Sequence, residues 1–533
     1  MVTDPPDRGP RRRRRIAANT AIFAVFTALS RVAGLVREII AAGFYGTSKA
    51  ASAFTIASQI PNLMSNLFAQ AALSAAFVPV FTDLLEQNRK REAFKLASTL
   101  FWIILIVLGS ITVLGIVLAG VILPLLGGHN FDGDLAATLT QIMFPVVLIL
   151  GLTGLLVGIL QSYDEFSIPA LAPVVWNAVI IALLVALHSQ FSHGHSIYAY
   201  AIAWLVATVV QMLMITSALR RIDFRLKFEI EWHDPRVKQV FMLMLPVTVG
   251  LGIVNLDALI NSTFGALVHG IHGQGPRAIQ LAFLIYMLPQ GVFSVAVSTV
   301  LFPTLSRQAS RREPAAMRHT LANGMRQINL LLIPAAGGML LLATPITRLV
   351  FQHGSFNADS THLTAEALRW FAVSLPFGGL NLLLTRTFFA LQRPWIPTRL
   401  AAINMVVDII LSIALYRPLG IAGLVIGTAA ANIVMTYLQI HRLRIGFNGR
   451  LEGDQTLMIT VRILVAAAIA TAIARGVWVL VDGVVGHSII GQIVSVGLAV
   501  LIASAFYAKA VLVMRIPEAR QIEALLLSRL RGR

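Results

Sequence analysis

The sequence predicts an all-α integral membrane protein with about fourteen transmembrane helices. Three observations carry this prediction: hydrophobic residues make up 57% of the 533 residues, charged residues make up only 12%, and the apolar residues form long blocks instead of helical stripes. Soluble domains contain about 25% charged residues, roughly twice as many. Because ~20 consecutive apolar residues span the hydrocarbon core of a bilayer, each block predicts a helix that crosses a membrane.

The predicted spans follow one another with short connections. They comprise residues 16–44, 50–83, 97–126, 136–160, 168–188, 197–219, 237–267, 276–305, 319–350, 364–390, 398–416, 420–441, 457–481 and 488–514. Only Arg417, Pro418 and Leu419 separate two of them, so we expect a tight turn there. We expect no cleaved signal peptide, because no short apolar region with a small-residue cleavage site appears at the start.

Basic residues gather in alternate loops between these spans. Basic runs lie at residues 11–15, 88–91 and 307–312, whereas the alternate loops at 127–135 and 351–363 contain no Lys or Arg. By the positive-inside rule, this asymmetry predicts that both termini lie in the cytoplasm. The net charge of +18 belongs mostly to segment ends and these loops. Since no basic face with interleaved aromatic residues lies outside the spans, we expect no nucleic-acid partner.

Three charges lie in the middle of the first span, at Arg31, Arg37 and Glu38. A charge at the centre of a bilayer costs ~2.5–3.5 kcal/mol on insertion scales, so charges kept there usually face a water-filled cavity or a partner. Arginine suits phosphate, because its guanidinium makes planar, bidentate contacts. The span therefore predicts a polar interior that handles a charged molecule. The alternative is an internal ion-pair network of all three residues with other helices.

The chain also contains an internal repeat. A stretch that ends at Pro79 recurs at Pro303, 224 residues later, and one that contains Pro169 recurs at Pro397, 228 residues later. Two six-span lobes in parallel orientation are typical of transporters whose substrate binds between the lobes. The predicted parts are a basic tail (1–15), an N-lobe (16–220), a C-lobe (221–445), two extra C-terminal helices (456–515) and a basic tail (516–533).

The second tail mixes basic residues with Ile522, Leu525, Leu526, Leu527 and Leu530. This composition predicts either an amphipathic helix on anionic membrane lipids or a frayed terminus.

Oxygen-bearing side chains recur one helical turn apart in the C-lobe. Asn404 and Asp408 share one helix face, Asp257 and Asn261 share another, and Thr428 lies in the next span. Carboxylate, amide and carbonyl oxygens suit hard cations such as Na⁺. The alternative is a set of hydrogen-bonded pairs that hold helices together. Na⁺, H⁺ and the membrane potential all remain open as driving forces, and we expect no other cofactor.

Signals for catalysis are absent from the sequence. It has no Walker A motif, nucleophile elbow or zinc spacing, so we expect a protein that is not an enzyme. The lack of Cys excludes disulfide and thiol chemistry. His188, His193 and His195 cluster in one loop, where we expect a solvated segment and not a metal site.

Several motifs resemble one family over roughly residues 16–515. They are Ser30-Arg31-Val32 with Gly34 and Arg37, Tyr45-Gly46, Ile60-Pro61-Asn62, residues 76–79 and 166–173, residues 349–356, and residues 389–392 with Pro397. This pattern is similar to that of the MurJ (MviN) lipid II flippases, within the multidrug/oligosaccharidyl-lipid/polysaccharide exporters. The resemblance implies two six-helix lobes plus two helices in the bacterial cytoplasmic membrane. It also implies alternating access, with the head group in a cationic cavity and the lipid tail outside it or in a groove formed by the last two helices.

The resemblance also implies a substrate and its binding residues. The substrate is lipid II, the undecaprenyl-pyrophosphate-linked peptidoglycan precursor, and cell-wall synthesis proteins are implied partners. Arg31 and Arg37 match two family arginines, and Glu38 stands where the family usually has Asp. The implied substrate-binding residues are Arg31, Arg37, Glu38, Ser65, Asn66 and Gln70.

This sequence departs from the family in several cavity charges. Ser65 and Asn66 lie where the family has an arginine. Gln70 replaces a family glutamate, Ser52 replaces an aspartate and Leu284 replaces an arginine. These losses leave open an exporter of another polyprenyl-linked glycan or amphiphile, or a non-transporting scaffold for cell-wall enzymes.

Some family members also have a sodium site that this sequence partly matches. Asn404, Asp408 and Thr428 agree by position with that site. Asn261 stands at the position of a family acid, and Asp257 lies one turn earlier. The resemblance therefore implies cation binding at these five residues.

Overall fold

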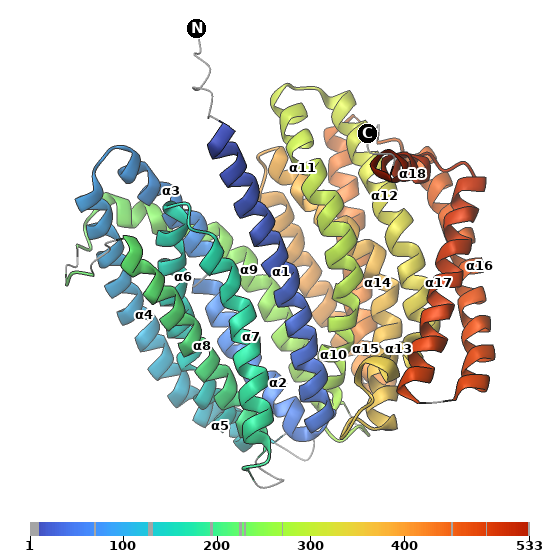
Figure 1. Cartoon of the computed structure of the whole chain (residues 1–533), viewed down its shortest axis with the longest axis horizontal. Coiled ribbons are helices and arrows are strands. Elements are labelled where there is room, and N and C mark those ends of the chain that lie inside the picture. Colours follow the sequence, from blue (N-terminus) through green and yellow to red (C-terminus); the bar gives the residue numbers. More distant parts are fainter. Residues whose placement is uncertain are drawn as a thin grey trace. The chain divides into compact units, whose positions relative to one another are not determined.

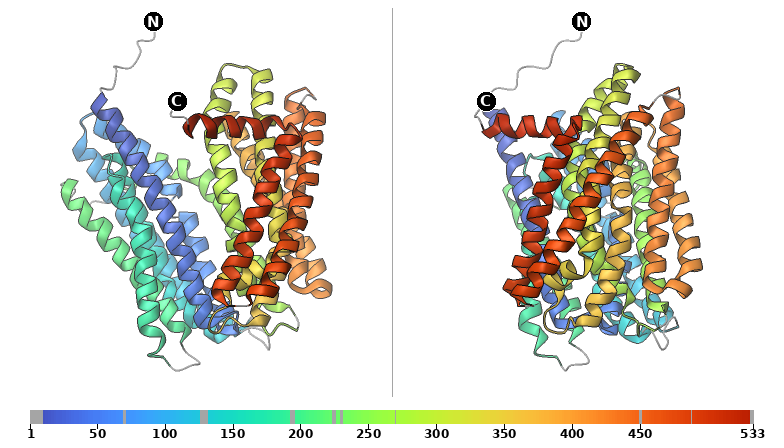
Figure 2. Two further views of the ribbon diagram at one scale, coloured as in Figure 1. Left: turned by 45° about the vertical axis from the view of Figure 1, so that its right-hand side comes forward. Right: turned by 90° about the vertical axis from the view of Figure 1, so that its right-hand side faces the viewer.

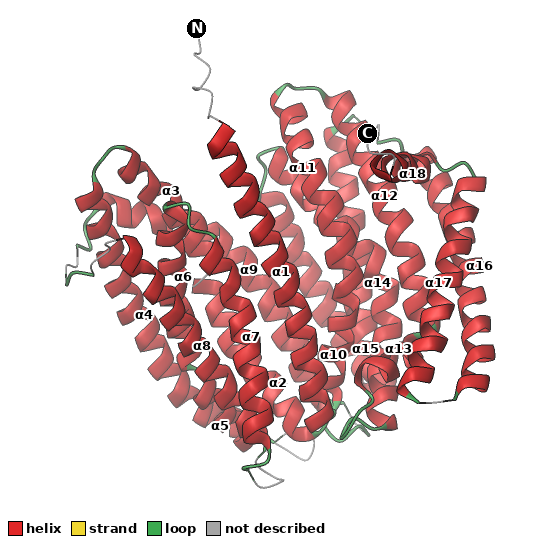
Figure 3. Cartoon of the chain, viewed as in Figure 1, coloured by secondary structure: helices red, strands yellow, loops and turns green. Residues whose placement is uncertain are grey.

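The computed structural model of the chain is helical throughout. It describes residues 10–68, 71–125, 132–191, 196–222, 226–228, 231–268, 270–448, 451–486 and 488–530. Every regular element in these ranges is a helix, as Figure 3 shows. Nine of the described helices are long and apolar enough to cross a membrane, or ten if one bent pair forms a single span. The all-α membrane fold is confirmed, whereas the number of fourteen spans stays a prediction.

The chain forms two compact units, residues 1–259 and 260–533. The helices of the first unit are α1 (Pro10–Tyr45), α2 (Lys49–Phe68), α3 (Ala71–Glu86), α4 (Lys90–Leu125), α5 (Gly133–Met143), α6 (Pro145–Ser162), α7 (Ser167–His188), α8 (Ile197–Leu219) and the 3₁₀ turn η1 (Arg220–Ile222), and the unit also contains most of α9 (Pro235–Leu267). Within this unit α7 packs against both α1 and α8 (Figure 1). The lobe and tail boundaries expected from the sequence stay predictions.

The second unit contains the remaining helices. They are α10 (Gly275–Pro289), the π-helical segment η2 (Gln290–Ser294), α11 (Val295–Ser310), α12 (Pro314–Leu341), α13 (Ala343–Phe351), α14 (Ala358–Ala390), α15 (Trp395–Gly446), α16 (Gly453–Val485), α17 (Ile489–Val513) and α18 (Pro517–Leu530). Here α14 packs against α12 and α15, while α16 packs against α12 and α17.

Four predicted spans are not single straight helices. The span 136–160 breaks at Phe144, because Pro145 lacks the backbone N–H that would continue the hydrogen-bond ladder. The span 276–305 passes through the π segment directly after Pro289. The span 50–83 forms the separate helices α2 and α3. The span 319–350 bends by 80° between α12 and α13. Hydropathy alone does not show these breaks, because apolar residues continue across each of them.

The tight turn expected at Arg417–Leu419 is confirmed by a break within α15. Gly420 has φ 58° and ψ −132°, a backbone conformation that glycine adopts without strain. Three residues on, a Cβ at Gly423 would lie 2.2 Å from the Leu415 carbonyl oxygen. Glycine at both positions therefore lets the two segments of α15 pack closely after the turn.

Two contacts attach the C-terminal helices to α12. Pro334 cannot donate a backbone hydrogen bond to the Leu330 carbonyl, and the Tyr507 hydroxyl of α17 donates to this oxygen at 2.7 Å instead. In α18, the buried Glu518 accepts a 2.5 Å hydrogen bond from Arg326 Nε. The expected amphipathic tail therefore forms a helix, which runs crosswise to α17 in Figure 2. Most of its apolar side chains lie outside the described part of the chain.

Candidate functional site

The first unit holds a buried polar cluster of Arg37, Glu38, Asn177 and Tyr200, which we name the arginine cluster. From α1, Arg37 donates to Asn177 Oδ1 of α7 at 3.0 Å and to Glu38 Oε1 at 2.8 Å. Tyr200 of α8 donates to the same Glu38 oxygen at 3.1 Å. The side chains of Arg37 and Glu38 are only 14% and 8% exposed. The cluster therefore joins three helices and neutralises its own charge.

Two tryptophans complete the surroundings of this arginine. The guanidinium carbon of Arg37 lies 5.0 Å from the ring centroid of Trp176 and 5.7 Å from that of Trp204, within the range of cation–π attraction. The indole N–H of Trp176 donates to Thr208 Oγ1 at 3.0 Å, which fixes the ring. Arg37 is thus held by ion pairing, hydrogen bonding and aromatic contacts together.

Arg31 differs from its two charged neighbours. Its side chain is exposed, and it forms no hydrogen bond or ion pair with any described residue. Arg37 and Glu38 form the internal network that was the alternative at this span, while Arg31 takes no part in it. The side chains of Ser65 and Asn66, and all of Gln70, lie outside the described residues, so their assignment to a substrate site stays a prediction.

The second unit holds a cluster of Asn261, Asp408, Ser412 and Thr428, which we name the aspartate cluster. Asn261 Nδ2 of α9 donates to Asp408 Oδ2 at 2.6 Å, and the Thr428 hydroxyl lies 3.3 Å from the same oxygen. Ser412 Oγ lies 3.3 Å from both Asp408 Oδ1 and Asn261 Oδ1. Asp408 is 1% exposed. The sequence thus predicted three of these four residues, and the structure brings them together.

The donor atoms of this cluster suit a hard cation. Asp408 contributes a buried carboxylate, which accepts hydrogen bonds from the amide of Asn261 and the hydroxyls of Ser412 and Thr428. One turn earlier in α15, Asn404 has a buried Oδ1 with no hydrogen-bond partner in the described part of the chain. These oxygens fit Na⁺. Asp257 lies four residues before Asn261 in α9, and its part in such a site stays a prediction.

Sequence reasoning missed Ser412 of the aspartate cluster and the adjacent Gly427. Ser412 continues the four-residue spacing of Asn404 and Asp408, so helical periodicity was a usable signal. Gly427 had no such signal: a Cβ there would lie 2.8 Å from Ser412 Oγ and 3.0 Å from Asp408 Oδ1. Glycine therefore lets the second segment of α15 approach the carboxylate.

Two apolar grooves run along α12 in the second unit. One, of about 490 Å³, lies between α12, α14 and α16, and we name it the α14 groove. The other, of about 420 Å³, lies between α12, α16 and α17 and includes Phe293, and we name it the α17 groove. The α17 groove agrees with the expectation of a tail groove formed by the last two helices, because α16 and α17 supply much of its wall.

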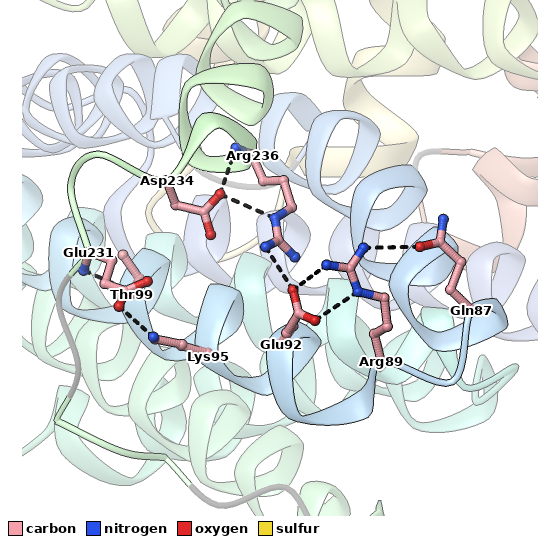
Figure 4. A network of polar contacts seen from close by, with 8 residues as sticks. All are labelled: Gln87, Arg89, Glu92, Lys95, Thr99, Glu231, Asp234 and Arg236. Atoms are coloured by element: carbon pink, nitrogen blue, oxygen red, sulfur yellow. Dashed lines mark hydrogen bonds and ion pairs between the residues drawn. The ribbon is translucent and has the colours of Figure 1, made fainter.

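A polar network joins the segment before α9 to α4 within the first unit (Figure 4). Glu92 accepts hydrogen bonds from Arg89 at 2.7 Å and from Arg236 at 2.8 Å, and Lys95 pairs with Glu231. The indole N–H of Trp102 donates to the Lys227 carbonyl at 2.9 Å. Residues 226–228 and 231–236 therefore lie against the first part of α4, where several independent contacts hold them.

Two further arginines of the second unit and the clustered histidines lie apart from these sites. Arg277 is buried and donates to Gln280 Oε1 at 2.8 Å. Arg386 of α14 donates to Thr299 Oγ1 of α11 at 2.8 Å. His188 stacks on Phe44 with ring centroids 4.1 Å apart, so it is packed and not a free loop residue. His193 and His195 lie outside the described residues.

Comparison with known proteins assigns the chain to a family. A family model described as "Lipid II flippase MurJ" matches residues 40–509. The chain is 31% identical over 426 residues to a probable lipid II flippase MurJ of Treponema pallidum, covering 78% of this chain and 79% of that protein. It is 31% identical over 432 residues to the lipid II flippase MurJ of Burkholderia cenocepacia, covering 78% and 82%.

Solved structures agree at the level of the fold. A lipid II flippase MurJ in an inward closed conformation matches with a TM-score of 0.76 at 22% identity, covering 93% of this chain and all of that one. A structure described as the inward-facing conformation of a multidrug resistance MATE family transporter of the MOP superfamily matches with a TM-score of 0.67 at 15% identity, covering 80% of this chain and 98% of that one. On the strength of the family model and these relatives, the chain belongs to the MurJ family of lipid II flippases.

Proposed function

We propose that this protein flips lipid II across the bacterial cytoplasmic membrane by alternating access, for cell-wall synthesis. The observation that carries the proposal is the family match over residues 40–509. The fold supports a transporter, not an enzyme, because its apolar helices enclose polar clusters without a catalytic motif. Both termini are proposed to face the cytoplasm, as the distribution of basic residues requires.

Arg31 is proposed to contact the pyrophosphate of the substrate. Its exposed guanidinium lies in the first predicted span, where an uncompensated cation is costly unless it serves a ligand. Arg37 and Glu38 are proposed to position α1 against α7 and α8, because their charges already satisfy each other. Direct phosphate binding in α1 is therefore assigned to Arg31, which has no partner among the described residues.

The aspartate cluster is proposed to bind the coupling ion. Asn261, Asn404, Asp408, Ser412 and Thr428 supply the oxygens that would hold Na⁺. When bound, the ion would supply a positive charge beside the Asp408 carboxylate. Without it, the donors of Asn261, Ser412 and Thr428 satisfy that carboxylate. The cluster therefore offers two hydrogen-bonding arrangements, with the amide and hydroxyl groups oriented either toward the carboxylate or toward an ion.

The α17 groove is proposed to accommodate the polyprenyl tail. Its wall is apolar, from Phe293 and Leu330 at one end to Ala474 and Val500 at the other. Burial of a hydrocarbon chain there requires no polar partner, so the tail stays in an apolar setting while the head group crosses.

The test is flipping of lipid II by the purified protein in liposomes, with and without a Na⁺ gradient. We expect flipping that the gradient accelerates and that Arg31→Gln abolishes, while the control Arg462→Gln leaves it unchanged. Flipping at the same rate with and without the gradient would support lipid II as the substrate and exclude sodium coupling. No flipping, in an assay in which another MurJ protein is active, would contradict the proposal and favour another polyprenyl-linked substrate or a scaffold.

A further inference from the structure

The α14 groove has a cationic mouth at one end. On α14, the lining residues Ala372 and Val373 are preceded one turn earlier by Arg369. On α16, the lining residue Thr471 is followed one turn later by Arg475. Because residues three or four apart share a helix face, both arginines extend the two walls of the groove in the same direction, beyond its last apolar residues.

Neither of these arginines is neutralised by an acidic side chain among the described residues. Arg369 donates to the Thr344 hydroxyl of α13 at 2.9 Å, and the guanidinium of Arg475 lies 4.5 Å from the ring centroid of Trp478. Both side chains are exposed, and neither forms an ion pair with any described residue. Each guanidinium therefore keeps donors for an external anion.

The positions of these arginines fit the level of lipid head groups. The 16 residues of α14 between Arg369 and Arg386 carry no charge, and the two arginines are separated by ~25 Å of helix, close to the thickness of a hydrocarbon core. Trp370 and Trp478 lie beside the two arginines, as aromatic residues do at a membrane interface. The mouth of the groove therefore lies where a lipid phosphate lies.

The body of the groove fits one acyl chain. Along α12 it extends from Asn329 to Leu341, ~18 Å of helix, which is close to one leaflet of a ~30 Å core. The groove is open to its surroundings, because Leu341, Val373 and Leu464 remain 43%, 39% and 50% exposed. At the far end Asn329 donates to Thr460 Oγ1 at 3.1 Å, so this polar pair is satisfied without a ligand.

We propose that the α14 groove is a binding site for an anionic phospholipid of the surrounding bilayer, with its phosphate on Arg369 and Arg475 and one acyl chain along α12. Basic pockets between transmembrane helices commonly bind anionic head groups. The single-leaflet length of the groove matches one acyl chain of a phospholipid. On the proposed orientation, the lipid belongs to the outer leaflet. The site is separate from the α17 groove, which lies on the other side of α16.

The test is native mass spectrometry of the purified full-length protein with three probes: phosphatidylglycerol, phosphatidylcholine and undecaprenyl pyrophosphate. We expect one tightly held phosphatidylglycerol per chain and weaker binding of phosphatidylcholine. Arg369→Gln and Arg475→Gln should each weaken phosphatidylglycerol binding about fivefold, the change that corresponds to ~1 kcal/mol. Ala468→Phe, an exposed position in the groove wall, should remove the acyl-chain site, while Arg462→Gln on the same helix should change nothing.

Several results would overturn the proposal. Unchanged binding in the Arg369→Gln/Arg475→Gln double variant would do so, as would equal affinity for phosphatidylcholine. Undecaprenyl pyrophosphate that displaces phosphatidylglycerol with the same arginine dependence would assign the groove to the transported lipid. A dimer that the variants dissociate without loss of lipid would assign it to a second copy of the chain. None of these readouts requires flipping, so they are independent of the proposed transport activity.

Discussion

The two units each place a buried polar cluster on corresponding helices of the repeat, but the clusters differ in charge. In the arginine cluster, Arg37 of α1 bonds to Asn177 of α7, and Glu38 bonds to Tyr200 of α8. In the aspartate cluster, Asn261 of α9 bonds to Asp408 in the first segment of α15, and Thr428 lies in its second segment. Arg37 and Asn261 are 224 residues apart, the offset of the repeat motif at Pro79 and Pro303.

This difference suggests how a duplicated scaffold acquires two roles. The arginine cluster contains its own cation, a guanidinium that the surrounding carboxylate, amide and tryptophans hold permanently. The aspartate cluster contains a carboxylate surrounded by the amide and hydroxyl oxygens of Asn261, Ser412 and Thr428, which are ligands that a mobile hard cation prefers. The cluster of the first unit would then be permanently neutralised, while the cluster of the second unit would respond to ions.

The largest expected effect is on the stability of the arginine cluster. Glu38→Ala leaves Arg37 buried without its carboxylate, and breaking such a pair costs ~3–5 kcal/mol. We expect the unfolding temperature of the purified protein to fall by many degrees. The double variant Glu38→Ala/Arg37→Met should recover much of the loss, because it removes both charges. A single variant as stable as the parent would show that the cluster is not a structural unit.

A second large effect is expected on ion coupling at the aspartate cluster. Asp408→Asn removes the only carboxylate of that cluster among the described residues. We expect lipid II flipping by this variant to lose its dependence on a Na⁺ gradient while the protein stays folded. If flipping by the variant keeps its full sodium dependence, the aspartate cluster is not the site of ion coupling and the proposed difference between the two clusters is wrong.

A moderate effect is expected at the glycine that packs on Asp408. In Gly427→Ala, the new methyl group would lie 2.8 Å from Ser412 Oγ and 3.0 Å from Asp408 Oδ1. Overpacking of this kind costs ~1–3 kcal/mol. The free energy of unfolding should fall by this amount, and Gly446→Ala is the control, because nothing lies near its Cβ. Equal effects of the two substitutions would contradict the close approach.

The smallest effect concerns pH and the attachment of the C-terminal helices. Burial alone would raise the pKa of Glu452, but hydrogen bonds from His319 and Arg326 outweigh it and hold the pKa below its ordinary value of 4.5. Because the pKa of this carboxyl is lower in the folded state than in the unfolded state, the ionised carboxylate stabilises the folded state at pH values above its ordinary pKa. This contribution is lost as the pH falls through the folded-state pKa. Stability should therefore decline below about pH 4.5, by under ~1 kcal/mol for such a partly exposed pair. In Glu452→Gln this part of the stability loss at low pH should be absent. If the stability of the variant depends on pH as that of the parent does, the role of Glu452 is contradicted.

Charge and periodicity made part of this molecule predictable. The helical membrane fold follows from the long apolar blocks, and Asn261 and Asp408 of the aspartate cluster follow from oxygen side chains spaced four apart. Thr428 followed from its place in the next span and from the family resemblance. The partners of Arg37 could not be predicted, because Trp176 and Tyr200 are ordinary residues of apolar spans until the helices pack. The breaks at Phe144 and after Pro289 were also missed, since apolar blocks continue through them.

The aspartate cluster, and not the arginine cluster, is proposed to take a mobile cation. The most direct test is equilibrium binding of ²²Na⁺ to the purified protein, compared among the parent, Asp408→Asn and Glu38→Gln. We expect one site per chain in the parent and in Glu38→Gln, and none in Asp408→Asn. Sodium binding that survives Asp408→Asn, or that Glu38→Gln abolishes in a folded protein, would contradict it.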